Sequence, residues 1–189
     1  MKNIAIFASG SGTNAQNIAE YFKPDKNIRV SLILANKPDA LVLERARKLS
    51  IPSLVFSRKD FYECDHVLNI IQEYKIDFIV LAGFLWMIPN NLLKAFPRRI
   101  INIHPALLPK YGGKGMYGDK VHQAVIQSGD KKTGISIHYV NDHYDEGEII
   151  FRKSFDIQPG DTAESIAKKV HALEYKYFPV VIEEIVKKI

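Results

Sequence analysis

The sequence predicts an α/β fold with a doubly wound, mostly parallel, Rossmann-like sheet and an antiparallel C-terminal hairpin. Strand-like and helix-like segments alternate through the first half of the chain, which is typical of a parallel sheet covered by helices. Ile76–Ala82 is almost continuously apolar, as expected of a central strand covered on both faces. Thr133–Val140 alternates between two faces, and Glu148–Phe155 follows a turn as its antiparallel partner.

The composition fits one globular domain over residues 1–189. Hydrophobic residues make up 47% and charged residues 25% of the 189-residue chain, enough for one core. The single cysteine, Cys64, excludes an intramolecular disulfide. No signal peptide is recognised, and no apolar stretch reaches the roughly 20 residues that span a bilayer. We therefore expect a cytoplasmic protein without a membrane partner.

The formal net charge is +5, but the basic residues are spread along the chain. Aromatic and basic residues do not interleave as they do in RNA-binding proteins, so no nucleic-acid partner is expected. A positive surface of this kind favours a phosphorylated small substrate.

A glycine-rich turn, Ser9–Asn14, joins a strand over Asn3–Ala8 to a helix over Ala15–Phe22. Such a turn directs free N–H groups and the positive end of the helix dipole towards an anion. Asn14 and Ala15 stand near where a dinucleotide-binding motif would need a third glycine, so one phosphate fits better than a pyrophosphate. The motif is also compatible with a purely structural turn.

The next elements continue the alternation of strands and helices. Arg29–Ala35 and Ile51–Phe56 are predicted strands, and Ala40–Leu49 between them is a predicted helix. Ser57 and Asp60 have capping-box spacing and begin a helix that is expected to run to about Tyr74. The residues expected to face inward from the two helices are Leu41, Ala46, Leu49, Phe61, Val67, Leu68 and Ile71.

An apolar segment, Leu85–Ile88, follows the central strand. An exposed segment of this kind is costly unless it packs in the core or lines a ligand pocket, and the residues alone favour the core. A short helix over Asn90–Phe96 precedes a strand, Arg99–His104, which Pro105 ends because proline has no N–H. On this strand Asn102 and His104 share one face, at the sheet edge where α/β proteins bind ligands.

Pro109–Gly118 contains four glycines in ten residues, so this loop is expected to be mobile. A helix over Asp119–Gln127 follows. Near the C-terminus, Asp161 is expected to cap a long helix over Ala163–Ile189, with Glu164 completing a capping box and Pro179 interrupting the helix.

Four polar residues from separate parts of the chain, Asn102, His104, His138 and Asp145, are expected to meet at one end of the sheet. The acidic residues near Asp145, with histidines nearby, suggest a metal site, but no ligand spacing supports one, and no metal is expected. An Asn–His–Asp set without a serine or cysteine nucleophile points instead to acyl transfer directly to an amine. Cys64 is expected to pack within its helix.

The stretch Asn102-Ile-His-Pro-Ala-Leu-Leu-Pro-Lys-Tyr111 resembles the signature of the formyltetrahydrofolate-dependent formyltransferases, and the likeness covers nearly the whole chain. The resemblance implies transfer of the formyl group of the co-substrate 10-formyltetrahydrofolate to the amine of 5-phosphoribosylglycinamide, in de novo purine (IMP) biosynthesis. It implies catalytic roles for Asn102, His104 and Asp145, with His138 in support. It also implies ribonucleotide binding by Gly12, Thr13, Asn14 and Glu174, and folate binding by Arg58, Leu85, Trp86, Met87, Ile88, Asn102, Asn141 and Asp145. The N-terminal half is thus expected to bind phosphate, and the C-terminal half to bind folate and catalyse.

The implied chemistry has physical requirements that these residues meet. Asn102 and a protonated His104 would donate to the oxyanion of the tetrahedral intermediate. Asp145 would carry the transferred proton and hold His104 cationic by charge pairing. The alternatives are another formyltetrahydrofolate-dependent transferase or hydrolase, which would normally carry a further domain, and a nucleotide-binding module without catalysis. The expected partners are small molecules, and the chain is expected to be a monomer or homodimer.

Overall fold

The computed structural model, which describes residues 1–189, contains one seven-stranded sheet in the order β3-β2-β1-β4-β5-β6-β7. The first five strands are parallel, β6 pairs antiparallel with β5, and β7 pairs antiparallel with β6. The predicted fold class is confirmed. The strands are β1 (Lys2–Ala8), β2 (Ile28–Ala35), β3 (Ser53–Val55), β4 (Phe78–Leu81), β5 (Ile100–His104), β6 (Lys132–Tyr139) and β7 (Ile149–Asp156).

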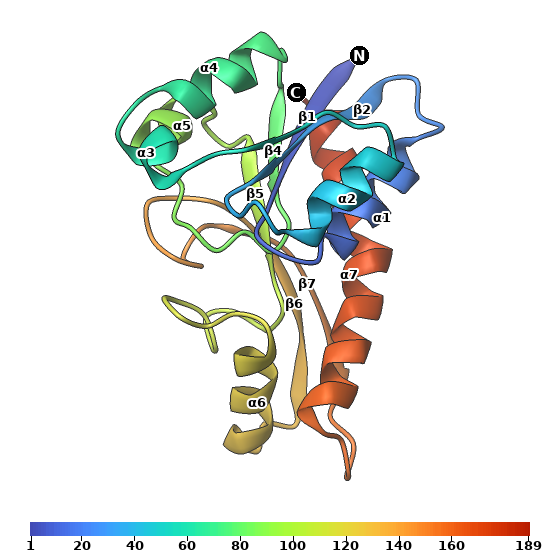
Figure 1. The fold of residues 1–189 in the computed structure, drawn as a ribbon. Coiled ribbons are helices and arrows are strands. Elements are labelled where there is room, and N and C mark those ends of the chain that lie inside the picture. The colour runs from blue at the N-terminus through green and yellow to red at the C-terminus, as the bar shows by residue number, and fades with distance from the viewer.

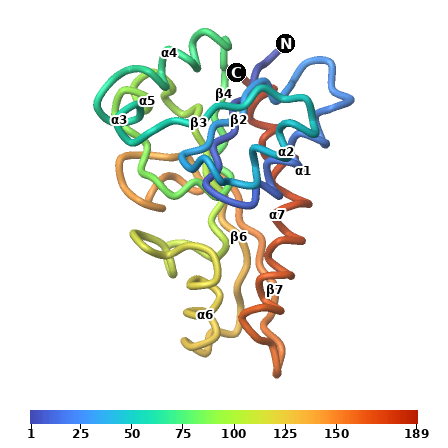
Figure 2. The backbone as a smooth tube through the Cα atoms, viewed as in Figure 1, coloured from blue at the N-terminus to red at the C-terminus, as the bar shows by residue number.

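Helices cover both faces of the sheet (Figure 1). One face carries α1 (Thr13–Phe22), α2 (Leu41–Lys48) and α7 (Ala163–Val186), with α6 (Asp119–Ser128) packed beside α7. The other face carries α3 (Arg58–Tyr62), α4 (His66–Glu73) and α5 (Asn90–Ala95). Figure 2 shows the same arrangement as a backbone trace. No helix combines the length and the apolar character needed to cross a membrane.

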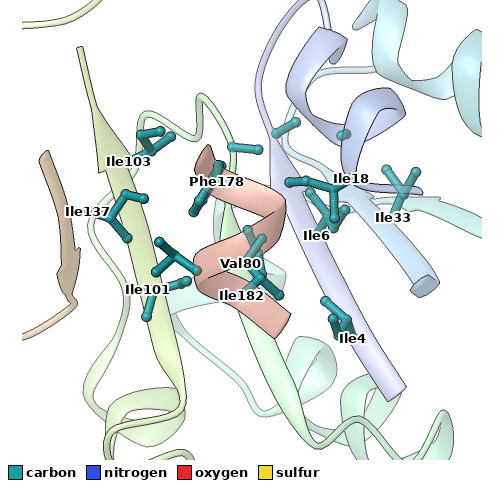
Figure 3. Close-up of a cluster of buried hydrophobic side chains, with 14 of the residues drawn as sticks. Ile4, Ile6, Ile18, Ile33, Val80, Ile101, Ile103, Ile137, Phe178 and Ile182 are labelled. Atoms are coloured by element: carbon teal, nitrogen blue, oxygen red, sulfur yellow. The ribbon is translucent and has the colours of Figure 1, made fainter. Parts of the chain in front are cut away.

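Alternation along the strands divides the core into two layers. On β1, Ile6 faces the larger hydrophobic cluster, which includes α1 and α7, whereas the next residue, Phe7, faces the smaller cluster beneath α3, α4 and α5. Figure 3 shows Ile101 of β5 in the larger cluster together with Phe178 and Ile182 of α7. Because odd-numbered β5 residues enter this core, their even-numbered neighbours face away from it.

The strand order reverses between β1 and β4, so the segments that leave these two strands diverge at the carboxyl edge of the sheet. Two hydrogen bonds join these segments there. The Ser9 N–H donates to the Gly83 carbonyl at 3.0 Å, and the Leu85 N–H donates to Ser9 Oγ at 3.0 Å. The candidate site forms at this edge.

The helix predicted from Ser57 to about Tyr74 is wrong in its length. The capping box of Ser57 and Asp60 is present, but α3 ends at Tyr62 and a separate helix, α4, begins at His66. Phe61 and Val67 are six positions apart, which places them about 120° apart around a straight helix. The break allows both to enter the smaller core cluster. Cys64 lies in this break and is exposed, so its predicted packing within a helix is also wrong.

The inward face of α2 differs from the prediction by one residue. Leu41 is 55% exposed, whereas its neighbour Val42 is fully buried. Val42 packs closely against Gly12, and its N–H donates to the Gly10 carbonyl at 3.1 Å. Ala46 is buried as expected, while Leu49 is only partly buried.

The first turn of α7 is capped by Thr162 and not by Asp161. Thr162 Oγ1 accepts from the Ser165 N–H, and Ser165 Oγ accepts from the Thr162 N–H, so the predicted box of Asp161 and Glu164 is wrong by one residue. Asp161 instead accepts from Lys169, which lowers the pKa of this carboxyl to about 2.

The predicted interruption at Pro179 is also wrong, because α7 continues through this residue. Proline has no N–H to donate to the carbonyl four residues before it, which is that of Tyr175. The side chain of Asn17 on α1 supplies the missing donor, with Nδ2 at 2.9 Å from the Tyr175 oxygen. A partner from another helix therefore satisfies the carbonyl that proline leaves free.

Asn17→Ala is expected to lower the free energy of unfolding by about 1 kcal/mol, the usual contribution of one hydrogen bond. For a chain of this size the midpoint of thermal unfolding should fall by roughly 2–4 °C. A double-mutant cycle with Pro179→Ala provides the control, because this substitution restores an N–H that can donate to the Tyr175 carbonyl. Asn17→Ala should cost less in that background. An equal cost in both backgrounds would contradict this account of the proline.

Candidate active site

A cavity of about 530 Å³ opens at the carboxyl edge of the sheet, and it brings together most of the predicted site residues. A second, smaller pocket of about 60 Å³ lies beside it. Phe84, Asn102, Tyr144 and Asp145 line both, so these four residues stand between the two spaces. The predicted residues that line the cavity are Gly12, Thr13, Asn14, Leu85, Asn102, His104, Asp145 and Glu174. Those that line only the smaller pocket are Trp86, Met87, Ile88, His138 and Asn141.

The glycine turn presents the N-terminus of α1 to the cavity. Gly12 has φ 71° and precedes the first helical residue, and no side chain caps the free N–H groups of the first turn. A Cβ at Gly12 would lie 2.4 Å from Val42 Cγ2 and 2.7 Å from Val42 Cα. Glycine is therefore required here by both backbone conformation and space.

Glu174 is buried in the wall of the cavity near this turn, with an exposed fraction of 4%. Its Oε2 accepts from Asn14 Nδ2 at 2.9 Å and contacts His171 Nδ1 at 2.9 Å. The hydrogen bond to Glu174 raises the pKa of His171 above its ordinary value. Glu174 is therefore not a solvated carboxylate on a helix surface, because its two contacts join it to α1 and to His171 of its own helix.

Strand pairing positions the catalytic candidates. Asn102 lies opposite His138 in the antiparallel pairing of β5 with β6, so both side chains occupy the same face of the sheet. Asn102 Nδ2 lies 3.1 Å from His138 Nε2 and 3.4 Å from Asp145 Oδ1. His138 Nδ1 contacts the Tyr139 carbonyl at 2.9 Å, which places a hydrogen on Nδ1 and leaves Nε2 to accept from Asn102. Both amide hydrogens of Asn102 thus face acceptors of the cluster.

His104 lies between a carbonyl and a carboxylate. Its Nε2 donates to the Tyr111 oxygen at 2.7 Å, and its Nδ1 is 3.5 Å from Asp145 Oδ2. The same Asp145 oxygen accepts from the Gly113 N–H at 3.0 Å. The glycine-rich loop is therefore attached to the catalytic candidates at two points, through Tyr111 and Gly113.

Burial is the largest influence on His104, and it lowers the pKa of this imidazole although Asp145 and the Tyr111 carbonyl act in the opposite direction. This differs from the expectation that charge pairing with Asp145 holds His104 cationic. Burial also acts to raise the pKa of Asp145, but His138, His104 and the Gly113 amide outweigh it and hold that pKa below its ordinary value. Asp145 is thus ionised at neutral pH, next to an imidazole that gains a second proton only with difficulty.

The apolar segment after β4 serves as core and as pocket lining. Ile88 packs in the smaller core cluster, Leu85 lines the cavity, and Trp86 and Met87 line the smaller pocket. Arg58 lines neither space. Its guanidinium lies 5.1 Å from the centre of the Tyr62 ring and 5.6 Å from that of Trp86, beside this segment.

Several residues at the site were not predicted from the sequence. The loop residues Tyr111 and Gly113 contact His104 and Asp145 through backbone atoms, which leave no mark in side-chain chemistry. His122 and His171 line the cavity from α6 and α7, and the only signal for them was that both are histidines within predicted helices. The structure contains no group of three or more His, Cys, Asp or Glu residues placed to hold a metal ion.

Comparison with known proteins identifies similar chains. A family model described as formyl transferase matches residues 2–182. The chain is 42% identical to the chloroplastic phosphoribosylglycinamide formyltransferase of Arabidopsis thaliana over 96% of its own length, and 37% identical to that of Bacillus subtilis over 98%. It spans 64% of the plant relative and 95% of the bacterial one.

A solved structure agrees with this match. The chain superimposes on glycinamide ribonucleotide transformylase 1 from Geobacillus kaustophilus with a TM-score of 0.88 and 35% identity, covering 98% of this chain and 99% of that one. In a second plant relative, from Vigna unguiculata, the chain spans 60% of the length. It thus covers less than two thirds of both plant relatives.

Proposed function

The chain belongs to the formyl transferase family, and from that premise we propose that it transfers the formyl group of 10-formyltetrahydrofolate to the amine of 5-phosphoribosylglycinamide, a step of purine (IMP) biosynthesis. One observation carries the proposal. A single cavity joins the uncapped N-terminus of α1 to Asn102, His104 and Asp145. A substrate with a phosphate at one end and an amine at the other fits this arrangement.

The ribonucleotide is assigned to the larger cavity. Its phosphate would bind the N–H groups at Gly12, Thr13 and Asn14, where the helix dipole favours an anion. Both hydrogen bonds of the Glu174 carboxylate use Oε2, which leaves Oε1 to accept from a hydroxyl of the ribose. Anchoring the phosphate holds the amine at the catalytic end, a proximity effect.

The folate is assigned to the smaller pocket and the surface beside it. Leu85–Ile88 and Asn141 would receive the pterin ring, because they surround the space that shares Asn102 and Asp145 with the cavity. Arg58 lies farther out, beside Trp86, where its charge suits the carboxylates at the glutamate end of the folate. The formyl group would then lie at the boundary between the two spaces.

The reaction forms a bond between the amine nitrogen and the formyl carbon and breaks the bond from that carbon to the folate nitrogen N10. The amine loses one proton and N10 gains one, so the protons balance. Negative charge on the formyl oxygen favours the doubly protonated imidazole of His104, which offsets the effect of burial as the intermediate forms. Asn102 would turn one amide hydrogen from His138 or Asp145 to this oxygen. Asp145 would transfer the proton. His138 would support Asp145 through Asn102, whose amide nitrogen faces both His138 Nε2 and Asp145 Oδ1.

Small molecules are the proposed partners, and neither nucleic acid nor a membrane is required. Cys64 is exposed and unpaired, which suits a reducing compartment, and we propose the cytoplasm. We keep the expectation of one domain acting as a monomer or homodimer.

One assay tests the proposed function. Pure protein is mixed with 10-formyltetrahydrofolate and either 5-phosphoribosylglycinamide, methionyl-tRNA or no acceptor, and release of tetrahydrofolate is followed. Fast release only with the ribonucleotide is the expected result. Formylation of the tRNA without turnover of the ribonucleotide would show that the protein is a different transferase. Release of tetrahydrofolate without an acceptor would show that it is a hydrolase. No release of tetrahydrofolate under any condition would indicate a binding module without catalysis.

Asn14→Ala is expected to weaken binding of the ribonucleotide by about tenfold or more, because the side chain holds the Glu174 carboxylate and its backbone lies at the phosphate end. Folate binding should change by less than about threefold, since Asn14 does not line the smaller pocket. Calorimetric titration with each ligand separately measures both effects. Equal losses for the two ligands would contradict the assignment.

A further inference from the structure

His122 is a buried titratable residue that the proposed reaction does not use. It lies on α6, its exposed fraction is 3%, and it lines the larger cavity. Its Nδ1 is buried and has no hydrogen-bond partner. Buried polar atoms in proteins are nearly always paired, so an unpaired imidazole in the wall of a cavity requires an explanation.

The surroundings of His122 place it in the ribonucleotide part of the cavity. Helix α6 packs beside α7, which carries His171 and Glu174. The charges of His171, Glu174 and His104 all act on the His122 imidazole. His122 lines the same cavity as His104, His171 and Glu174, and it does not line the smaller pocket assigned to folate.

The chemistry of the ring restricts what it can bind. Burial, and secondarily the nearby His171, lowers the pKa of His122, so the imidazole is neutral at physiological pH. A neutral imidazole offers one N–H donor and one lone pair. This pair matches a hydroxyl or an amide, which both donates and accepts, better than a phosphate dianion, which only accepts and would leave the lone pair unused.

We propose that His122 binds the uncharged middle of the ribonucleotide, meaning the ribose hydroxyls and the glycinamide amide between the phosphate and the amine. The inference rests on the proposed function and adds a specificity residue to it. The phosphate is held at Gly12–Asn14 and the amine at His104 and Asp145. Only the sugar and amide then remain to pair with a neutral, buried imidazole in the same cavity.

The test uses His122→Leu, which removes both polar atoms at similar volume, and His122→Gln, which keeps a donor and an acceptor. His122→Leu should raise the KM of the ribonucleotide about tenfold to a hundredfold, with kcat and the KM of the folate changed less than about threefold. His122→Gln should restore most of the loss. His66→Gln is the matched control, because His66 is exposed on α4 and lines neither space.

A comparison of inorganic phosphate with the ribonucleotide distinguishes the proposed His122 contact from binding of the phosphate group. The affinity of inorganic phosphate, measured by calorimetry, should be the same for wild type and His122→Leu, whereas that of the ribonucleotide should fall. An unchanged ribonucleotide KM in a folded His122→Leu protein would overturn the proposal. So would an equal loss for both substrates, which indicates a structural role. If wild-type protein does not bind the ribonucleotide at all, the proposed function fails first and this inference with it.

A second measurement observes His122 directly in the wild-type protein. In wild-type protein labelled with ¹⁵N at histidine, the ring nitrogens of His122 should shift when the ribonucleotide is added and stay unchanged with inorganic phosphate. His122→Gln, which keeps the polar character of the site, assigns the signals. No shift at saturating ribonucleotide would overturn the proposal.

Discussion

Asp145→Asn is expected to lower kcat by about two to four decades, the usual range for a general acid–base group. The KM of each substrate should stay within a few-fold, because most of the assigned binding contacts lie away from Asp145, at Gly12–Asn14 for the ribonucleotide and at Leu85–Ile88 for the folate. The change removes the charge that faces His104 Nδ1 at 3.5 Å and the group that would carry the proton. An interaction made only in the transition state lowers kcat and kcat/KM together.

The substitution is well suited to this position. Asp145 has φ 57°, a left-handed conformation that asparagine tolerates and most other residues do not. An asparagine oxygen can still accept from the Gly113 N–H, so the loop attachment is retained. Asp142→Asn is the matched control, since Asp142 lies in the same turn, is exposed, and lines neither the cavity nor the smaller pocket.

Combination with His104→Ala tests whether the two residues act as a unit. The double variant should be little slower than the worse single variant, because residues of one proton-transfer unit are strongly non-additive. Circular dichroism and thermal unfolding must show that each variant is folded. A folded Asp145→Asn enzyme with near-wild-type kcat would refute the role, and multiplicative losses in the double variant would show that His104 and Asp145 act independently.

Gly12→Ala is expected to lower the free energy of unfolding by about 2–4 kcal/mol, through strain at positive φ and overlap with Val42. The midpoint of thermal unfolding should fall by roughly 10 °C for a chain of this size. Since relief of the overlap moves the turn away from α2, the phosphate end of the cavity should change shape. The ribonucleotide KM should therefore rise at least tenfold, with a smaller effect on the folate KM.

Gly10→Ala is the matched control for Gly12→Ala, because it also replaces a glycine of the same turn by alanine. A Cβ at Gly10 meets no atom within 4 Å, and Gly10 does not have a positive φ. Its stability should remain within about 0.5 kcal/mol of the wild type. Thermal unfolding of the two variants side by side gives the comparison. Equal stability of Gly10→Ala and Gly12→Ala would contradict the close packing of the turn against Val42.

Features that depend on neighbours in the chain could be predicted from the sequence alone. The apolar run Ile76–Ala82 identified a buried central strand, and Ser57 with Asp60 identified a helix start, because pleat alternation and capping act over a few residues. The same alternation placed Asn102 and His104 on one face at a strand end. A short signature around these residues sufficed to indicate the family.

Features that depend on partners far along the chain became visible only in the folded molecule. Helix α7 passes through Pro179 because Asn17, 158 residues before Tyr175, supplies a donor. The helix after Ser57 breaks because Phe61 and Val67, six residues apart, must both reach a core that is formed with strands distant in the chain. Val42 is buried in place of Leu41 because Gly12 lies against it. His122 and His171 belong to the cavity only because α6 and α7 pack together. The backbone of Tyr111 and Gly113 contacts His104 and Asp145 only once β5 and the turn at Asp145 are in place. In each case the local sequence permits more than one arrangement, and long-range packing and hydrogen bonding select one.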